Sequence, residues 1–373
     1  MRVLICPDKF AGTISALAAA RAVAEGWVRA AEGDEPVIRP LSDGGPGFVE
    51  VLAAALGGRR VPVSTVDPLG RPTPGEILLK DQIGYVESAH ACGLHLLAEA
   101  ERNPRITTSY GLGALIATAV EAGARRVVIG LGGSATNDCG AGLLAALGAA
   151  PVDGAGYALP YGGAALTAAA GLAGEPALRG VELVAATDVD SPLTGLHGAS
   201  NVFGPQKGAT QEDVLLLDAA LERFAGVLEK GLRGCPDGLA SLPGAGAAGG
   251  LGAAVLALGG RCASGIALVR MLTGLDQALD EADLVITGEG SFDHQSLRGK
   301  VVAGVAAGAR DRGVPCVVVA GRVTTGRREA AAAGVTEAHS LEEHFGSVEE
   351  ALARPAEGLR ELGERLARQW SPG

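Results

Sequence analysis

The sequence predicts an α/β fold with two domains. Short apolar runs that end in glycine, proline or aspartate alternate with longer stretches rich in alanine and leucine, as in a parallel sheet covered by helices. Aromatic residues make up only 3% of the chain, so aliphatic side chains must form the core, which suits such a sheet better than a β-sandwich. The length of 373 residues favours two domains over one.

The elements follow one another as a repeated unit of strand, polar glycine loop and helix. Apolar runs predict strands at residues 3–6, 37–38, 126–130, 182–186, 284–287 and 316–320. Stretches rich in alanine and leucine predict helices at residues 15–31, 48–56, 112–122, 214–232 and 301–312. Residues 164–171 are of low complexity and predict a surface loop or a short helix. Ligands of open α/β sheets bind at the carboxyl ends of the strands, so the segments after the strands are expected to carry the chemistry.

The pattern changes between residues 60 and 110. Short strand-like pieces at 60–64, 77–80 and 85–87 replace the repeated unit, and a turn at 67–72 joins the first two, which indicates a domain border. The first strand resembles the last two in character. The two chain ends, residues 1–70 plus 284–373, are therefore expected to form one Rossmann-like or flavodoxin-like parallel-sheet domain. Residues 71–283 are expected to be an inserted second α/β domain, with the active site in the cleft between the two.

Charge and cysteine usage narrow the class of protein. The net charge of -11 argues against a nucleic-acid groove or an anionic membrane surface, and favours a small-molecule site. No apolar stretch reaches the roughly 18 residues of a membrane span, and the N-terminus does not resemble a signal peptide. The six cysteines are scattered, without the spacing of a zinc site or a disulfide framework. We expect a protein of the reducing cytoplasm.

Lysine is rare in this chain. Only five of the 31 basic residues are lysine, and Lys9, Lys207 and Lys300 all lie in glycine-rich motifs. An ammonium group is a compact charge that suits a single phosphate oxygen, whereas a guanidinium group binds as a planar fork. The three lysines are therefore candidates for phosphate contacts, with chance and codon bias as the alternative.

The first two motifs combine an acid with a helix start. Residues 6–15 place Asp8, Lys9 and Ser15 where a helix begins, which is a ready anion site. The alternative is structural, with Thr13 or Ser15 as an N-cap and Asp8 as a turn former. Residues 42–47 place Asp43 before Gly44 and Gly45, so the backbone can close on a ligand, although a plain Asp-Gly turn is the alternative.

The third motif, residues 130–142, is the strongest local signal. Several glycines after a strand can form an anion nest, and Ser134, Thr136, Asn137 and Asp138 offer hydrogen bonds to a polyol or a phosphate. The spacing matches neither the P-loop nor the dinucleotide-binding fingerprint.

Three later motifs complete the set. Asp188 follows a strand and can bind a metal or accept a proton, while residues 243–252 form a glycine-rich loop suited to phosphates or to a flexible hinge. Residues 288–300 place Glu289 and Asp293 before a helix, and His294 there is either a base or a solvated loop histidine. Anion nests, carboxylates and lysines without a Ser-His-Asp arrangement fit phosphoryl transfer.

The motifs occur in one order along the chain, at residues 7–10, 42–45, 132–138, 203–209, 243–250 and 287–290. This series closely resembles the bacterial glycerate kinase family, the type that makes 2-phosphoglycerate. The resemblance implies phosphorylation of D-glycerate with ATP and Mg²⁺, and two α/β domains of which the second is inserted into the first. It implies ATP and a small hydroxy acid as partners and no nucleic acid or membrane, with a homodimer as an open alternative for the assembly.

The resemblance also assigns roles to residues. It places the substrate at Asp8, Ser15, Gly44, Gly45, Asn137 and Asp138. It places nucleotide phosphates at Gly132, Gly133, Ser134, Gly244, Gly246, Gly249, Gly250 and Lys300. Lys9, Asp43 and Asp188 are the expected catalytic residues, with Asp188 as the base or a Mg²⁺ ligand and with Glu289 and Asp293 as further metal ligands.

The sequence departs from the family pattern at several motif positions. Ala11 stands where a lysine is usual, Pro46 where an acid is usual, Phe48 where a threonine is usual, and Ser291 where an arginine is common. These losses of charged or hydroxyl groups bear on the acceptor more than on the fold. A related kinase for another small hydroxy acid and a non-catalytic ligand-binding homologue are therefore the alternatives.

Overall fold

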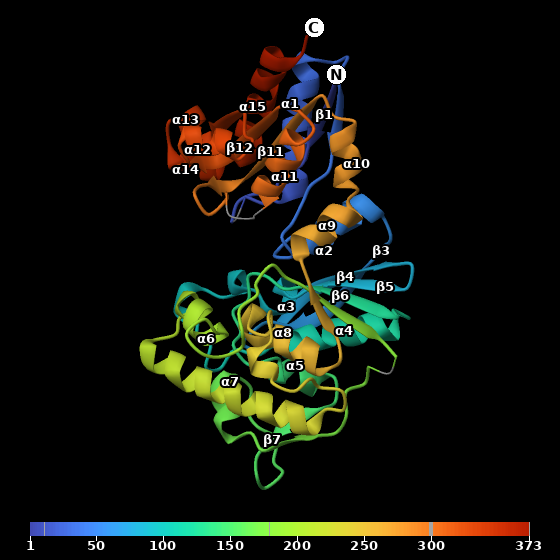
Figure 1. Cartoon of the computed structure of the whole chain (residues 1–373), viewed down its shortest axis with the longest axis vertical. Coiled ribbons are helices and arrows are strands. Elements are labelled where there is room, and N and C mark those ends of the chain that lie inside the picture. Colours follow the sequence, from blue (N-terminus) through green and yellow to red (C-terminus); the bar gives the residue numbers. More distant parts are fainter. Residues whose placement is uncertain (11, 179, 298–300, 373) are drawn as a thin grey trace. The chain divides into compact units, whose positions relative to one another are not determined.

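The computed structural model of the chain describes residues 1–10, 12–178, 180–297 and 301–372. The chain divides into two compact units, each built from separate segments (Figure 1). Unit 1 comprises residues 1–43, 50–57 and 266–373, and unit 2 comprises residues 44–49 and 58–265. Ala11 and Lys300 lie outside the described residues.

Unit 1 contains a five-stranded parallel sheet. Its strands, in spatial order, are β13 (Glu337–Ser340), β12 (Cys316–Val323), β11 (Leu284–Phe292), β1 (Arg2–Ile5) and β2 (Glu35–Ile38). Its helices are α1 (Ala16–Ala30), α9 (Gly265–Leu272), α10 (Leu275–Asp280), α11 (Val301–Arg310), α12 (Arg327–Ala332), α13 (Leu341–Phe345), α14 (Val348–Ala353) and α15 (Pro355–Trp370). The order β2-β1-β11-β12-β13 is the flavodoxin-like order, in which ligands bind where the strand order reverses, here beside β1 and β11.

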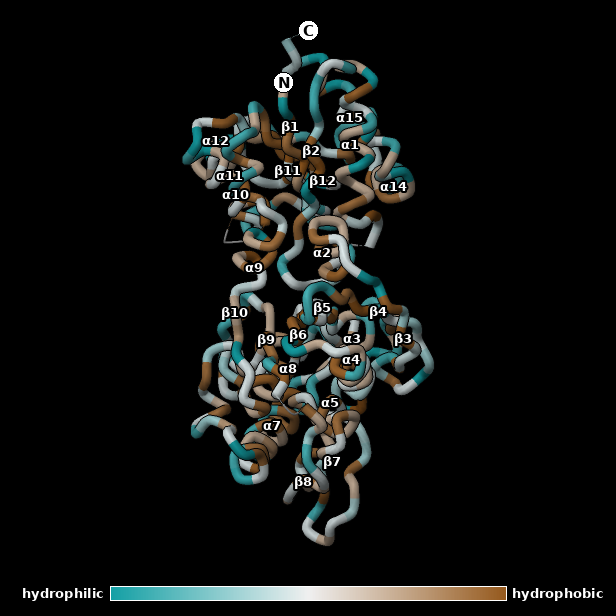
Figure 2. Tube along the Cα trace, turned by 90° about the vertical axis from the view of Figure 1, so that its right-hand side faces the viewer, coloured by the Kyte–Doolittle hydropathy of each residue, from teal (hydrophilic) through white to brown (hydrophobic). Residues whose placement is uncertain are grey.

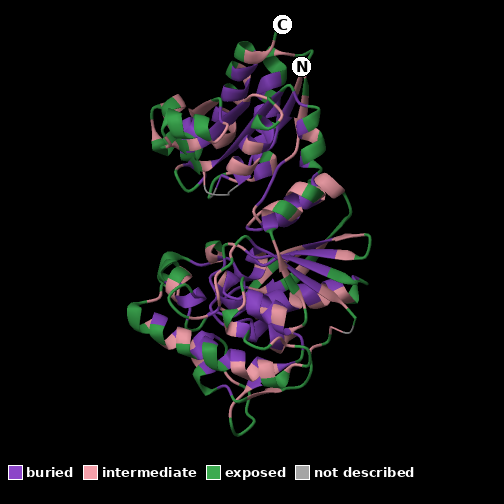
Figure 3. Cartoon of the chain, viewed as in Figure 1, coloured by how far each residue is buried: buried purple, intermediate pink, exposed green. Residues whose placement is uncertain are grey.

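Helices α1 and α15 of unit 1 pack closely against each other. A Cβ atom on Gly26 would lie 1.8 Å from the carbonyl oxygen of Arg360, and one on Gly363 would lie 2.3 Å from that of Val23, so both positions require glycine. The fully buried Trp27 side chain belongs to the same core. Figure 2 shows β1, β11 and β12 of the unit 1 sheet as mostly hydrophobic, and Figure 3 shows them as mostly buried.

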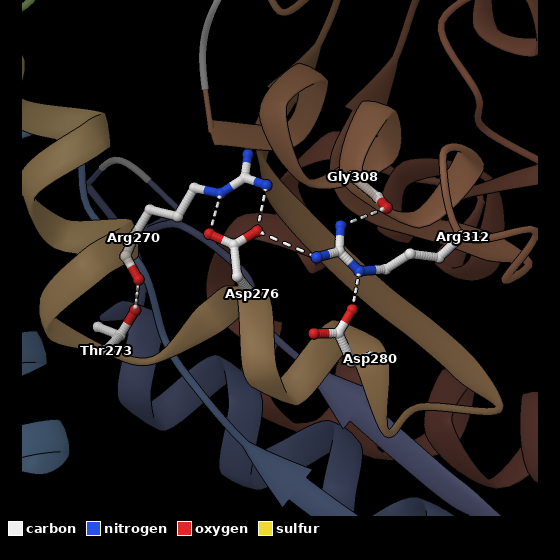
Figure 4. A network of polar contacts seen from close by, with 6 residues as sticks. All are labelled: Arg270, Thr273, Asp276, Asp280, Gly308 and Arg312. Atoms are coloured by element: carbon white, nitrogen blue, oxygen red, sulfur yellow. Dashed lines mark hydrogen bonds and ion pairs between the residues drawn. The ribbon is translucent and has the colours of Figure 1, made fainter.

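A network of ion pairs joins α9 and α10 to the end of α11 (Figure 4). The Arg270 guanidinium donates to the Asp276 carboxylate, and Arg312 donates to Asp276 at 3.4 Å as well as to Asp280. Arg312 also donates to the Gly308 carbonyl oxygen. The network attaches the short helix α10 to unit 1.

Unit 2 contains a mixed six-stranded sheet and a small hairpin. The sheet strands, in spatial order, are β10 (Arg261–Ala263), β9 (Glu182–Ala186), β6 (Arg126–Gly130), β5 (Ile83–Glu87), β4 (Pro72–Lys80) and β3 (Arg59–Val66), and the hairpin pairs β7 (Ala150–Val152) with β8 (Gly171–Ala173). The first four sheet strands are parallel, and β4 and β3 are antiparallel to their neighbours. The α-helices are α3 (Ala89–Cys92), α4 (Tyr110–Glu121), α5 (Ala141–Ala146), α6 (Ala199–Phe203), α7 (Gln211–Gly231) and α8 (Ala247–Ala257).

Short 3₁₀ helices and one shared helix complete the chain. The 3₁₀ helices are η1 (Leu94–Leu96), η2 (Glu99–Glu101), η3 (Gly163–Ala168), η4 (Pro205–Lys207) and η5 (Leu239–Ser241). Helix α2 (Phe48–Leu56) begins in unit 2 and continues in unit 1. Within the described ranges, every helix is too short or too polar to span a lipid bilayer.

The α/β class with parallel sheets is confirmed. The borders of the two units differ from the predicted ones at 70/71 and 283/284. Strand β3 pairs with β4 along its whole length, from Arg59 opposite Leu79 to Val66 opposite Pro72, so the hairpin cannot be divided near residue 70. At the second border, α9 and α10 belong to unit 1, where the ion pairs of Asp276 join them to Arg312.

Candidate functional site

An acidic cavity of about 450 Å³ lies at the carboxyl edge of the unit 1 sheet. Each of the five strands contributes to it, either with its last residues or with the segment that follows. Its charged lining residues are Asp8, Lys9, Asp43, Glu289, Asp293, Arg322 and Glu342, and its other lining residues include Phe10, Thr13, Ser291, Leu341, Val348 and Leu352. We call this space the acidic cavity. It brings together the predicted residues of three motifs that lie far apart in the sequence.

Lys9 holds the first two motifs together in this cavity. Its Nζ atom lies 3.4 Å from Oδ1 of Asp43 and 3.7 Å from Oδ1 of Asp8. The backbone N–H of Lys9 donates to Asp8 Oδ1 at 2.7 Å, and that of Asp8 donates to the carbonyl oxygen of Gly288. The first loop is thereby attached to β11. The Asp43 side chain stays 41% exposed, so it is accessible to a ligand.

The end of β11 supplies two further carboxylates. Glu289 is 8% exposed and lines the cavity. Asp293 accepts hydrogen bonds at Oδ1 from the backbone N–H groups of Gln295 and Ser296, which fixes the turn after the strand. Backbone contact brings β11 and β12 close at this edge, because a Cβ atom on Gly321 would lie 2.5 Å from the carbonyl oxygen of Gly290.

Ser15 and Lys300, two predicted ligand contacts, are not among the residues of this cavity that the structure describes. Ser15 caps α1, where its side chain accepts from the backbone N–H of Ala18 at 3.3 Å, which is the structural role that the sequence left open. The phosphate contact predicted for Lys300 concerns a residue outside the described ranges.

In unit 2, Asp138 joins two helix starts. Its Oδ2 accepts from the N–H and the Oγ of Ser109, both at 2.8 Å, and from the N–H of Gly142. Its Oδ1 accepts from the N–H of Gly140. Ser109 precedes α4 and Gly140 precedes α5, so a buried negative charge lies at two helix N-termini, where it is favourable. Burial raises the pKa of Asp138, and the four hydrogen bonds oppose that rise.

Lys207 holds the other side of the same loop. Its Nζ atom donates to Ser134 Oγ at 3.0 Å and to the carbonyl oxygen of Thr136 at 2.7 Å. The side chain is 1% exposed, and this burial lowers its pKa to about 8, although nearby Asp138 acts in the opposite direction. Asn137 is fully buried and donates to Ser200 Oγ, while its Oδ1 has no hydrogen-bond partner within the described part of the chain. The loop is thus preorganised by buried polar contacts.

Many predicted phosphate-binding glycines pack against backbone. Cβ atoms on Gly246 and Gly249 would lie 2.2 and 2.0 Å from the carbonyl oxygens of Pro192 and Thr136. Gly250 has φ +91°, and its Cβ would lie 2.7 Å from Cys139 Cα. These three glycines allow the 243–250 loop to pack directly on its neighbours, so they have a structural reason that needs no phosphate.

The glycines of the second and third motifs meet each other in unit 2. A Cβ atom on Gly132 would lie 2.5 Å from the Cα of Gly45, and one on Gly44 would lie 2.9 Å from the carbonyl oxygen of Ala186. Gly133 has φ +66° and lies against the ring of Pro46. Their role as phosphate or substrate contacts stays a prediction, and close packing accounts for Gly44 and Gly132.

Asp188 lies in a second, more open cavity of about 300 Å³ in unit 2. Ser264 Oγ donates to its Oδ1 at 2.6 Å. Asp190 and Gly244 also line this cavity, so the predicted phosphate-binding loop and the predicted carboxylate share one space there.

Sequence reasoning missed three charged residues, Arg322, Glu342 and Glu87. Arg322 lines the acidic cavity from the end of β12, and the rule that ligands bind at the carboxyl ends of strands would have found it. Glu87 ends β5 and is 3% exposed, and its Oε2 accepts from the N–H groups of Gly47 and Val49 at the start of α2. No local signal distinguished Glu87, because its partners lie about forty residues earlier in the chain.

Comparison with known proteins decides the family. The profile of the Glycerate kinase family matches residues 3–371. The chain belongs to the glycerate kinase family. It is 38% identical to the glycerate 2-kinase of Escherichia coli K12, over 98% of this chain and 97% of that one. It is also 38% identical to the glycerate kinase of Halalkalibacterium halodurans, over 98% of this chain and 97% of that one.

A solved structure agrees with this membership. The crystal structure of a putative glycerate kinase 2 from Salmonella typhimurium LT2 matches with a TM-score of 0.81 and 37% identity, over 99% of this chain and 98% of that one. As a member of the glycerate kinase family, the protein is a kinase.

The acidic cavity fits the groups that a kinase of this family needs. Mg²⁺ prefers oxygen ligands and is usually held by one or two carboxylates together with substrate phosphates, so a complete cage of protein ligands is not required. Among the described residues, no three histidine, cysteine, aspartate or glutamate side chains form a group that could hold a metal ion. Carboxylates from Asp8, Glu289 and Asp293 and the ammonium group of Lys9 share one cavity, which is a donor set suited to Mg²⁺ and phosphate oxygens.

The residues that depart from the family pattern lie in different parts of the structure. Phe48 is fully buried, and a Cβ atom on Gly130 would lie 2.8 Å from its ring, so packing accounts for this residue. Pro46 lies against Gly133 in unit 2. Ser291 lines the acidic cavity. Ala11 is outside the described residues, so Ser291 is the departure that the structure connects to the acidic cavity.

Proposed function

We propose that this member of the glycerate kinase family transfers the γ-phosphoryl group of ATP to a hydroxyl of D-glycerate and so forms 2-phosphoglycerate. The observation that carries the proposal is the acidic cavity, where carboxylates and a lysine from separate motifs meet at the strand-order reversal of a flavodoxin-like sheet. The named glycerate 2-kinase among the relatives supports the 2-position.

Different residues of the cavity have different roles in the proposed reaction. ATP supplies the phosphoryl group, and Mg²⁺ neutralises phosphate charge when both are bound. One or two of the carboxylates of Asp8, Glu289 and Asp293 would hold the metal, together with phosphate oxygens of ATP. Lys9 is placed by Asp8 and Asp43 and offers a positive charge to an anionic oxygen. Asp43, as the more exposed carboxylate, accepts the proton of the attacking hydroxyl.

Asp188 is the second candidate for that proton transfer. It lies in unit 2 with its Oδ1 hydrogen-bonded to Ser264, beside Gly244 of the glycine-rich loop. Asn137 and Asp138 are fully buried, and we propose that they hold the loop of residues 131–140 in position.

Substitutions at the two carboxylates test the assignment. Asp43→Asn should lower kcat about 100-fold or more in a coupled ADP-release assay with D-glycerate, because a general base contributes roughly 10²–10⁴-fold. Asp188→Asn is measured in parallel, and Asp81→Asn, at a side chain that is 79% exposed, is the control. If Asp188→Asn abolishes turnover while Asp43→Asn leaves it intact, Asp188 is the base.

A screen of acceptors tests the alternative substrates. The departure at Ser291 keeps another small hydroxy acid as a second candidate, because this residue lines the cavity. D-glycerate should be turned over with a higher kcat/KM than tartronate or tartrate. A preference for tartronate or tartrate would refute D-glycerate as the substrate and retain the kinase chemistry.

A further inference from the structure

The ligands proposed for the acidic cavity are strongly anionic. Among the lining residues that the structure describes, Lys9 and Arg322 are the two with a positive charge, against the carboxylates named above. Lys9 lies between Asp8 and Asp43. Both the hydroxy acid and the phosphates of ATP carry anionic oxygens. The Arg322 guanidinium is therefore a candidate group to bind one of them.

Arg322 lies beside Ser291 across a strand pair. Strands β11 and β12 are parallel, and Ser291 is in register with Arg322. Neighbouring residues in register point to the same face of a sheet, and adjacent strands are only about 4.8 Å apart. Both residues are exposed, and both line the acidic cavity. A long side chain from either position therefore reaches the same part of the cavity.

Ser291 is the position where the family pattern commonly has an arginine. The structure thus places an arginine on the neighbouring strand, next to the position where the sequence lacks the expected one. We propose that Arg322 supplies, from β12, the guanidinium that binds an anionic group of the substrates in this cavity. This inference rests on the proposed function.

The contacts of Arg322 leave it able to bind a ligand. Its Nε atom lies 3.2 Å from Oε2 of Glu342, and the side chain is 63% exposed. Such an exposed pair contributes little to stability, so Glu342 orients the guanidinium without locking it. A guanidinium has five N–H donors in a planar fork and binds a carboxylate or a phosphate through two parallel hydrogen bonds.

Exchange of the two residues is the sharpest test. Arg322→Ser removes the guanidinium, and the double variant Ser291→Arg/Arg322→Ser returns it from the neighbouring strand. Arg310→Ser is the control, because Arg310 is a 54% exposed arginine of unit 1 that is ion-paired with Asp311 and does not line the cavity. Circular dichroism confirms that each variant is folded.

Two ligands are measured separately. KM for D-glycerate and the calorimetric Kd for the Mg²⁺ complex of the non-hydrolysable analogue AMP-PNP show whether Arg322 binds the carboxylate or the phosphates. Arg322→Ser should weaken one of these by about tenfold to 100-fold, as expected for a charge-assisted bidentate contact. The double variant should recover binding of the same ligand to within about fivefold of wild type.

Three outcomes overturn the inference. Unchanged affinity of Arg322→Ser for both ligands would show that the guanidinium binds neither. Weakened binding that the double variant does not restore would show that the two positions are not equivalent. An equal loss in Arg310→Ser would show that the effect is not specific to the cavity. A wild-type protein that binds MgAMP-PNP but does not phosphorylate D-glycerate would refute the proposed function, and the calorimetric comparison would still test Arg322.

Discussion

Replacement of Lys207 by methionine tests how the buried loop of unit 2 is held. The substitution keeps a long side chain and removes the ammonium group that donates to Ser134 and Thr136. Two opposing contributions to the free energy of unfolding change. Two hydrogen bonds from a charged donor are lost, and a buried charge is no longer removed from water.

The magnitudes of these contributions partly cancel at neutral pH. Two hydrogen bonds to a charged group contribute about 3–6 kcal/mol together. The fall of the Lys207 pKa from 10.5 to about 8 corresponds to an unfavourable contribution of roughly 3 kcal/mol. Lys207→Met should therefore destabilise unit 2 by about 0–3 kcal/mol at pH 7.

The pH dependence separates the two contributions. Because the pKa of Lys207 is lower in the folded protein, the unfolded chain binds more protons between about pH 8 and the unfolded pKa of 10.5. The burial penalty is fully present below pH 8 and decreases as pH rises through this window. Wild type should gain stability over Lys207→Met by about 1.4 kcal/mol per pH unit above pH 8.

The assay is urea unfolding at pH 7 and pH 9.5. All four tyrosines lie in unit 2 and both tryptophans in unit 1, so near-UV circular dichroism of tyrosine reports on unit 2 and tryptophan fluorescence reports on unit 1. Lys230→Met, at an exposed position of α7, is the control and should show no such change. A stability difference between wild type and Lys207→Met that is the same at both pH values would refute the reasoning.

Three further predictions concern packing, charge and thiols. Gly250→Ala should lower the stability of unit 2 by about 2–4 kcal/mol in urea unfolding, because the added Cβ would meet backbone. Gly156 has a similar φ of +87° but open space around the added Cβ, so Gly156→Ala should cost only about 1 kcal/mol. Equal effects of the two substitutions would contradict a packing role for Gly250. Asp276→Asn should lower the free energy of unfolding by at most about 1 kcal/mol, and by less in 1 M salt, because the ion pairs of Asp276 with Arg270 and Arg312 are partly exposed. A larger loss of stability that does not depend on salt would contradict this prediction. Burial shields four of the six cysteines and raises the pKa of their thiols, at Cys6, Cys92, Cys139 and Cys316. Ellman's reagent should therefore react with at most two cysteines before denaturation. Reaction of three or more cysteines in the folded protein would contradict this prediction.

The local elements of the fold were predictable because each carries its own periodic signal. The predicted strand at 126–130 coincides with β6, and the predicted helix at 48–56 coincides with α2. The position of the unit border was not predictable, because it depends on which strands pair. The run of residues 59–80 indicated two strand-like pieces joined by a turn, but not that β3 and β4 both belong to unit 2.

The candidate site was predictable where residue type and strand end coincide. Asp8, Lys9 and Asp43 follow strands, and they meet in one cavity. The glycine-rich loops gave a less specific signal, because a glycine that avoids a clash with backbone looks the same in sequence as one that approaches a phosphate. Gly249, whose Cβ would lie 2.0 Å from a carbonyl oxygen, is the clearest instance.

The phosphorylation of D-glycerate is the most direct test of the proposed function. The wild-type protein is incubated with D-glycerate, ATP and Mg²⁺, and the product is identified by phosphorus NMR with proton coupling. The account predicts ADP release that depends on D-glycerate, and one phosphate coupled to the single proton at carbon 2. A phosphate coupled to the two protons of carbon 3 would contradict the assigned position, and no acceptor-dependent ADP release would contradict the kinase reaction itself.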